Sequence, residues 1–599
     1  MKRSFKIIAG IISGCALWCC CNTKTSTTSV VDKIKLPQDV YPSCTVTPAM
    51  FNSWFASGKA EPNGLVLPAN SVAFQHQNNC EFYQWSENMF LWLTSPNAKQ
   101  YGSENTVLES PLFYDVLPAD STGNRKLQPH TANSPLRMAS HVTKNGPNRL
   151  PVIIDTKGRM LEVETAESAP KAKALVKSAA GAQVEVDHVS LDSKGAFVFM
   201  DKAGKVIQHP QAIIRHKLNQ KNIVERFTAG GRSVFLDAAG NQVQTEAGQA
   251  TGDVLMAQNG SLVYYLTMVN DVYAWFLTGA TNGKLSANTF PTTQGALDSI
   301  ITYAKANNVT LPDSNTLAME LKTSWVEASS LSNASDYVTV MATIPTYNTS
   351  NPQQWIPNGE KTVKMALVGM HIVGSVAGHP EMIWSTFEHQ SNTPNAEYQY
   401  LDSNKKVKVV PQDTGTGWLF SKDASDKSFN VSHMTNVDKN FNSTDTITAD
   451  SGFTITPSNT LSALPWGSAK DSVTNQEDQS SAASNSEIIS INNNIRSLLG
   501  DKDVRANYLL IGATWTSGGA PPTGGVYGLN GTAPGVSIGT SVLANSTMET
   551  YFQQPKFSCF TCHSSSVPAL NPDSISHIYG KIIPLITVHN DMEKKKKGK

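Results

Sequence analysis

Hydrophobic and polar positions along this chain follow helical spacing in some segments and strand-like patterns in others. The helical spacing predicts three clear helices. One is predicted within 71–96, where large apolar residues follow each other at helical spacing: Phe82, Trp85, Met89 and Trp92. Two further helices are predicted at 292–308 and 487–500. The last of them ends at Gly500, and glycine commonly terminates a helix.

Short runs of β-branched and aromatic residues predict the strands. Three such runs lie at 319–328, 364–378 and 507–517. The stretch 261–279 combines features of a strand and of a helix. Together with the predicted helices, these runs predict an α+β fold.

Residues 148–262 form a region rich in β-like runs. Three of these runs contain Asp-x-x-Gly, at 155–158, 201–204 and 237–240. Each predicts a hairpin whose glycine occupies the turn position of positive φ. The Asp-x-Asp-x-Asp pattern of a calcium loop is absent from these turns, so we attribute the aspartates to turn chemistry.

Changes in pattern and composition divide the chain into six parts. In order, they are a leader, a polar tether, a mixed segment, the hairpin-rich region, a mixed α+β main region and a C-terminal segment with a basic tail: 1–21, 22–35, 36–147, 148–262, 263–556 and 557–599. Within the main region, 444–486 is rich in Ser, Thr, Asn and Asp and predicts long loops.

The leader has the layout of a bacterial export signal. Basic residues at its start precede an apolar run of about a dozen residues, which is too short to span a bilayer. Small residues before a cysteine are typical of a lipoprotein signal, and the candidates for lipid modification are Cys15, Cys19, Cys20 and Cys21. We therefore expect a protein of the periplasm or cell envelope, attached to the membrane only by an N-terminal lipid anchor; a plain secretory signal is the alternative.

Charge and cysteine content narrow the function further. Basic and acidic residues number 48 each, so the chain is neutral and lacks the positive footprint of a nucleic-acid-binding protein. Four cysteines lie outside the leader: Cys44, Cys80, Cys559 and Cys562. Unpaired thiols are disfavoured in an oxidising compartment, and no motif surrounds Cys44 or Cys80, so we expect a disulfide between them.

The run "KFSCFTCHSSS" contains a Cys-x-x-Cys-His motif formed by Cys559, Cys562 and His563. Such a cysteine pair can form a redox disulfide, half of a zinc site or a c-type haem attachment site. A thioredoxin-like context is missing upstream, and no second Cys-x-x-Cys supplies zinc ligands. Haem attachment needs these residues in this order, since two thiols bind the vinyl groups and the adjacent imidazole binds iron. We expect one covalent haem c per chain, attached within 557–599.

The C-terminal runs "LANSTMETYFQQPKFSCFTCH" and "NYLLIGATWTS" resemble segments of uncharacterised bacterial exported proteins of the c-type cytochrome family, which carry a single C-terminal Cys-x-x-Cys-His motif. Residues 319–325 and 365–389 are similar to other recurring blocks of those proteins. The resemblance covers roughly 250–599 and, more weakly, the predicted helix around Cys80. It implies a single covalent haem and indicates no substrate.

The short segment after His563 cannot enclose a porphyrin alone, so we expect upstream residues to cover the opposite side of the haem. The block 365–389 offers three histidines: His371, His379 and His389. His371 lies in an apolar run, as a hydrogen-bonded core histidine would, and His379 precedes a proline in a predicted solvated turn. His389 ends its segment beside polar neighbours and is our candidate for the distal iron ligand. The tail offers three alternatives: His577, His589 and Met592.

Strand alternation in "MELKTSW" would place Glu320, Lys322 and Ser324 on one face. The simpler interpretation is that this face meets solvent. If it faces a pocket instead, Glu320 and Lys322 would form a buried pair of the kind that tunes a redox centre or moves protons.

The sequence thus predicts a monohaem c-type cytochrome that transfers electrons. One alternative is a haem-dependent oxidoreductase, peroxidase-like or oxidase-like, with an open distal site. Another is a surface binding protein with an accessory haem. The motif identifies neither a redox partner protein nor a small-molecule substrate.

Overall fold

A computed structural model describes most of the chain. The described residues are 31–96, 98–117, 124–140, 150, 152–155, 160–165, 175–191, 197–215, 220–229, 232–243, 245–250, 254–286, 290–437, 443–450, 452–467, 480–522, 533–540, 543–551, 553, 559–563, 576, 578 and 582–586. The expected leader, with Cys15, Cys19, Cys20 and Cys21, lies outside them, and so do His577, His589 and Met592.

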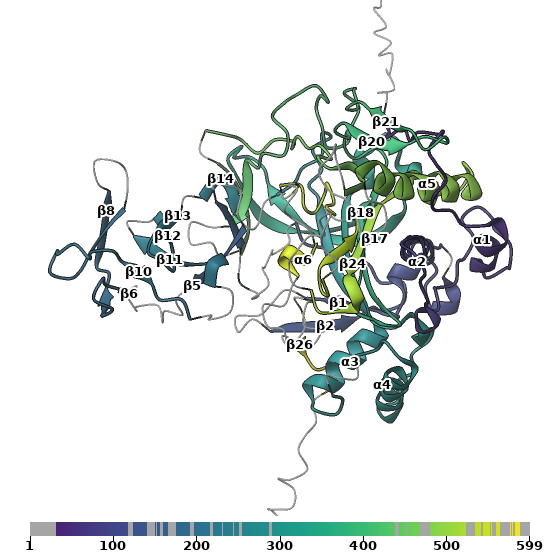
Figure 1. The fold of residues 1–599 in the computed structure, drawn as a ribbon, viewed down its shortest axis with the longest axis horizontal. Helices are drawn as coiled ribbons and strands as arrows, with labels where there is room; N and C mark the ends of the chain where they lie inside the picture. The colour runs from purple at the N-terminus through teal and green to yellow at the C-terminus, as the bar shows by residue number, and fades with distance from the viewer. Residues whose placement is uncertain are drawn as a thin grey trace, which may run out of the picture.

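A mixed thirteen-stranded sheet forms the centre of the molecule, with the path β25-β24-β19-β18-β16-β15-β1-β2-β26 (Figure 1). Its strands are β1 (Phe113–Val116), β2 (Arg125–Pro129), β3 (Leu136–Arg137), β15 (Tyr264–Asn270), β16 (Met319–Glu327), β17 (Thr339–Asn348), β18 (Gln354–Val376), β19 (His379–His389), β22 (Met434–Val437), β23 (Ser443–Ala449), β24 (Tyr508–Thr516), β25 (Ser537–Gly539) and β26 (Ile582–Ile583). Neighbours pair antiparallel along this path except for β2 with β26.

Helices pack on both faces of this sheet. They are α1 (Pro48–Trp54), α2 (Cys80–Leu93), α3 (Asp271–Thr281), α4 (Gln294–Ala306), α5 (Ser481–Leu499) and α6 (Cys559–Cys562). Side-chain caps begin several of them: the Ser480 hydroxyl, for example, accepts a hydrogen bond from Ala483 N at the start of α5. Gly500 ends α5 with a positive φ of 71°. Within the described residues, no helix has the length and apolarity needed to cross a membrane.

The region between β3 and β15 forms a separate β-rich lobe on the left of Figure 1. Its strands are β4 (Val152–Asp155), β5 (Met160–Thr165), β6 (Leu175–Lys177), β7 (Gln183–Glu185), β8 (His188–Leu191), β9 (Phe197–Met200), β10 (Gln211–Ala212), β11 (Ile223–Ala229), β12 (Arg232–Asp237), β13 (Gln242–Val243) and β14 (Thr245–Ala250). A separate hairpin in the main region pairs β20 (Tyr398–Leu401) with β21 (Val407–Val410). Helices and strands together confirm the α+β class.

Two of the predicted Asp-x-x-Gly turns adopt the expected conformation. Gly204 and Gly240 have positive φ values of 75° and 88°, and each donates its N–H to the carbonyl of the aspartate three residues before it. A Cβ at Gly240 would also lie 2.4 Å from the carbonyl oxygen of Pro210. The remaining Asp-x-x-Gly turn, at 155–158 between β4 and β5, lies outside the described residues after Asp155.

The two faces of the central sheet bury different kinds of side chain. On one face, Leu321, Ile372 and Phe387 join an apolar core with α2 and α5, and the rings of Phe90 and Phe387 stack at 4.3 Å. The opposite face carries polar residues on the middle strands and is covered by the C-terminal part of the chain. The candidate functional site lies on this second face.

Cys44 and Cys80, the pair expected to form a disulfide, are bonded with an S–S distance of 2.01 Å. The bond joins the segment before α1 to the first residue of α2. Ser490 of α5 donates to the carbonyl of Cys44 and accepts from its N–H, both at 3.0 Å. The disulfide therefore connects the N-terminal segment to α2, and the Ser490 hydrogen bonds connect the same segment to α5.

Replacing both cysteines, Cys44→Ala with Cys80→Ala, should destabilise the protein by about 4 kcal/mol, because the bond closes a loop across a sequence separation of 36 residues. Denaturant unfolding followed by tryptophan fluorescence measures this loss. Reductant should lower the stability of the unchanged protein and leave the double variant unaffected. Equal stability of the two proteins under oxidising conditions would contradict the proposed role of the bond.

Candidate functional site

The polar face of the sheet is built by residues that lie opposite each other on three neighbouring strands. Lys322 on β16 pairs with His371 on β18, and His371 pairs with Thr386 on β19. The adjacent row contains Glu320, Val373 and Trp384. Strand alternation thus turns these side chains to the same side, and Glu320, Lys322 and Ser324 share this face as the sequence predicted.

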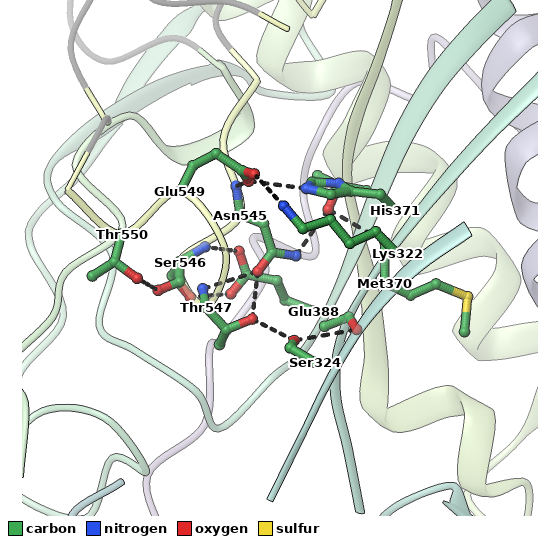
Figure 2. A network of polar contacts seen from close by, with 12 residues as sticks. Lys322, Ser324, Met370, His371, Glu388, Asn545, Ser546, Thr547, Glu549 and Thr550 are labelled. Atoms are coloured by element: carbon green, nitrogen blue, oxygen red, sulfur yellow. Dashed lines mark hydrogen bonds and ion pairs between the residues drawn. The ribbon is translucent and has the colours of Figure 1, made fainter. Parts of the chain in front are cut away.

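Residues 543–551 lie across this face as a polar strap, which Figure 2 shows from close by. Glu549 Oε2 lies 2.9 Å from His371 Nε2, and Glu549 Oε1 lies 3.9 Å from Lys322 Nζ. The N–H of Asn545 donates to the same Oε2 at 3.0 Å. One carboxylate therefore joins the strap to two strands of the sheet.

Glu388 on β19 anchors the strap at a second point. Its Oε1 accepts the N–H of Ser546 at 2.7 Å, and its Oε2 accepts the Ser546 hydroxyl and the Asn392 amide. Burial raises the pKa of Glu388, although these hydrogen bonds oppose that rise. A buried carboxyl with three donors around it holds this part of the chain in one arrangement.

Hydroxyl and amide groups fill the space between these anchors. Ser324 and Thr547 share a hydrogen bond of 2.7 Å, and Asn545 Nδ2 donates to Thr386 Oγ1 at 2.9 Å. The strap reaches the sheet here because position 369 is glycine: an added Cβ would lie 2.5 Å from Thr547 Oγ1. A larger residue at Gly369 would displace the strap.

The Cys-x-x-Cys-His motif lies on the same side of the sheet. Residues Cys559–Cys562 form the single helical turn α6, and His563 N donates to Cys559 O at 2.9 Å. Phe560 is buried and meets Trp384 edge-on at 5.8 Å, and the His563 ring lies 4.3 Å from the Trp384 ring. The half-buried Cys559 contacts both main apolar cores, whereas the side chain of Cys562 lies outside the described part of the structure.

This arrangement fits the donor set of a c-type haem. Residues three apart on a helical turn project from the same side, so the two cysteine positions of α6 can serve one macrocycle. His563 follows directly, where an axial imidazole is required. Trp384 of β19 packs against that imidazole and can limit its rotation.

Glu320 is covered rather than exposed to solvent. The Ser576 hydroxyl donates to its Oε2. Burial raises the pKa of Glu320, while Ser576, Arg125 and Lys322 act in the opposite direction. The polar face of β16 is therefore covered. Within the described residues, Lys322 forms its ion pair with Glu549 rather than with Glu320.

The three histidines of the 365–389 block take different places. His371 faces the strap on the same side as α6. His389 points to the opposite side, where its ring stacks on Tyr337 at 3.7 Å and its Nε2 lies 3.2 Å from the Asp336 carbonyl oxygen. Burial lowers the pKa of His389 to about 3, so this imidazole is neutral. His371 is thus the histidine that shares a face with the motif.

The expectation that His379 is a solvated turn residue is wrong. It is the first residue of β19, and its side chain is only 7% exposed. Its Nδ1 lies 2.9 Å from Glu381 Oε1. The proline at 380 does not prevent the strand because it lies near the strand's beginning, before the run that pairs with β24.

Sequence reasoning did not single out the strap residues or Glu388. The run "LANSTMETYFQQ" was noticed only as part of the resemblance, because its polar residues match no catalytic spacing. One available signal was Glu388 itself, a carboxylate at the end of an apolar and aromatic run. A charged group in such a run needs buried partners.

Comparison with protein-family models, with curated proteins and with solved structures found no match. The chemistry of the site therefore rests on the residues described above.

Replacing Glu388 with glutamine should loosen the strap. The amide would direct N–H groups toward partners that are themselves donors, so at least one charged hydrogen bond is lost. Such bonds contribute about 1.5–3 kcal/mol, which corresponds to roughly 10- to 100-fold faster hydrogen exchange across 545–551.

The matched control is Glu360→Gln, because Glu360 pairs with Arg137 at an exposed position. Exchange at 545–551 should stay unchanged in that variant. Equal exchange rates in the Glu388→Gln and unchanged proteins would show that Glu388 does not hold the strap.

Proposed function

We propose that this protein is a monohaem c-type cytochrome that transfers single electrons through a covalently attached haem. Cys559 and Cys562 would form the two thioether bonds, and His563 would bind the iron. The observation that carries this proposal is the helical turn α6, in which the two cysteine positions stand three residues apart and His563 follows beside the Trp384 ring of β19.

When bound, a haem at this site supplies one-electron chemistry. The chain's own residues hold the attachment segment in place. Phe560 inserts into the apolar core beside Trp384, and the same tryptophan lies against the His563 ring. The strap 543–551 shields the adjoining part of the sheet from water. Trp384 lies far upstream in sequence and contacts the His563 ring, and we propose that upstream residues of the same face also cover the haem.

A haem-dependent oxidoreductase is the second candidate. The observation that favours it is the half-buried group of Lys322, His371 and Glu549 on the same face as Trp384 and α6. A histidine and a carboxylate in hydrogen-bond contact can accept and return protons. Peroxide or oxygen chemistry needs such groups, whereas simple electron transfer does not.

We further propose that the protein is exported and held at the cell envelope by a lipid on one of its N-terminal cysteines. This proposal rests on the sequence of the leader and on the need for export before bacterial haem c attachment. It assigns the membrane contact to the N-terminal anchor alone.

The test of the proposed haem is attachment that survives denaturation. Protein produced with cytochrome c maturation enzymes should keep its haem through acid-acetone extraction and on a denaturing gel. Cys559→Ala and Cys562→Ala should each leave at most one thioether, which shifts the pyridine haemochrome band. The double variant Cys44→Ala with Cys80→Ala, which removes two cysteines outside the motif and leaves neither unpaired, is the control. Complete extraction of haem from the unchanged protein would overturn the assignment.

The position of the two histidines predicts different spectra for their variants. His371 shares a face with α6, so His371→Ala should change the spin state or the midpoint potential of the haem. His389→Ala should leave both unchanged, since this residue faces Tyr337 on the other side of the sheet. Absorbance spectra of the oxidised and reduced proteins, with a redox titration, measure both effects.

Circular dichroism of each variant checks that the fold survives. The reverse pattern, with the change only in His389→Ala, would restore His389 as the distal ligand. Loss of peroxide reactivity in His371→Ala with an unchanged resting spectrum would favour the oxidoreductase.

A further inference from the structure

A second pair of histidines lies at the beginning of β19, outside the proposed haem site. His76 comes from the loop before α2 and His379 from the first position of β19. Their facing nitrogens, His76 Nδ1 and His379 Nε2, are 3.4 Å apart. We infer that these two imidazoles bind a divalent transition-metal ion between them.

The separation of the two nitrogens is the first support. Nitrogens bound to one tetrahedral metal at about 2.0–2.1 Å lie roughly 3.3–3.4 Å from each other. The observed 3.4 Å between the two nitrogens matches the spacing of two ligands on one ion.

The environment of His379 is the second support. Its Nδ1 lies 2.9 Å from Oε1 of Glu381, whose side chain is fully buried. The carboxylate makes Nδ1 the protonated nitrogen and leaves the Nε2 lone pair directed at His76. Metal-binding histidines are commonly held in this way by a carboxylate on the other ring nitrogen.

The Glu381 carboxylate has few hydrogen-bond donors around it. Its Oε1 also accepts the Thr516 N–H at 3.3 Å, but within the described residues its buried Oε2 has no hydrogen-bond partner. A buried carboxylate with so few donors is costly unless positive charge lies nearby. A metal ion on the far side of His379 would supply that charge.

The surrounding residues fix both rings and leave a route for the ion. Phe82 lies against His379 at 5.0 Å and against His76 at 4.7 Å. Glu81 of α2 accepts the N–H groups of Gln77 and Asn78, which ties the loop carrying His76 to the helix. His76 is exposed whereas His379 is buried, so the ion can enter from the His76 side.

Two imidazoles select the class of ion. Nitrogen ligands suit Cu²⁺, Ni²⁺ and Zn²⁺, and Cu²⁺ binds most tightly in the usual order of stability. Among the described residues, no group of three or more His, Cys, Asp or Glu side chains comes together to hold a metal. The pair therefore provides an open site, whose remaining positions go to water or to an added ligand.

The test is a titration of the full-length protein with Cu²⁺ and, separately, with Zn²⁺, followed by calorimetry. One equivalent should bind in addition to any held by the Cys559 and Cys562 thiols, and electron paramagnetic resonance of the Cu²⁺ form should show nitrogen coupling. His76→Gln and His379→Gln should each weaken this binding at least 100-fold. Glu381→Gln should weaken it about 10- to 100-fold, as for other carboxylates that orient a ligand.

His433→Gln is the matched control, because His433 is a half-buried histidine whose Nε2 contacts Thr456 and whose ring lies beside Phe453, with no part in the pair of His76 and His379. It should bind as the unchanged protein does. Cys559 and Cys562 are present in every variant, so thiol binding cancels in the comparison. If this equivalent of metal does not bind, or if both histidine variants bind metal as tightly as the unchanged protein, then His76 and His379 form only a hydrogen-bonded pair. Thermal melting confirms that each variant is folded.

This inference does not depend on the proposed haem. No atom of α6 contributes to the histidine pair, and the copper signal is measured without any haem activity. Failure of haem attachment would therefore leave the metal site intact, and failure of metal binding would leave the cytochrome proposal intact.

Discussion

The central constraint on this structure is the need to satisfy polar groups that strand alternation places on a covered face of the sheet. The opposite face packs on helices mainly through apolar side chains, and its few polar groups, such as Thr323 and Ser385, find partners within the sheet. The polar face carries Glu320, Lys322, His371 and Glu388, each of which would be costly to bury alone. Its cover must therefore bring donors and acceptors at defined places, as the strap 543–551 does.

The strap makes the position of α6 depend on residues far away in sequence. Ser546 is fixed by Glu388 and Glu549 by His371, at sequence separations of 158 and 178 residues. The chain reaches Cys559 only a few residues later. Phe560 then adds an apolar contact with Trp384. Polar contacts thus determine the course of the strap across the sheet, and the contact between Phe560 and Trp384 fixes the position of α6.

Much of the fold was predictable because its elements have strong local patterns. The helical spacing of Phe82, Trp85 and Met89 corresponds to α2, and Gly500 ends α5 as expected. The stretch 261–279, which combined strand and helix features, is a strand followed by a helix: β15 and then α3. The order of strands was not predictable, because β24 joins β19 across more than a hundred residues and no local pattern encodes that pairing.

The candidate site was predictable in its chemistry and not in its surroundings. The motif alone predicts haem attachment at Cys559, Cys562 and His563, because that attachment has a fixed spacing, and this assignment stays a proposal. The choice between His371 and His389 depended on which face of the sheet each one occupies. His371 and His389 belong to different strands, so their spacing in the sequence does not show whether they lie on the same face. Their faces become clear only from the strand pairing, which places His371 opposite Thr386.

Strand β19 connects the two sites that this structure contains. Trp384 lies against His563 with one part of its ring system, and its Nε1–H donates to the Glu381 carbonyl at 3.0 Å. The Glu381 side chain in turn orients His379. A buried sequence of contacts therefore runs from the exposed His76 to the proposed iron ligand. If a haem is attached at α6 as proposed, this sequence of contacts would give the large protein around it a physical reason, since the sheet would join the cofactor to a second group at the surface.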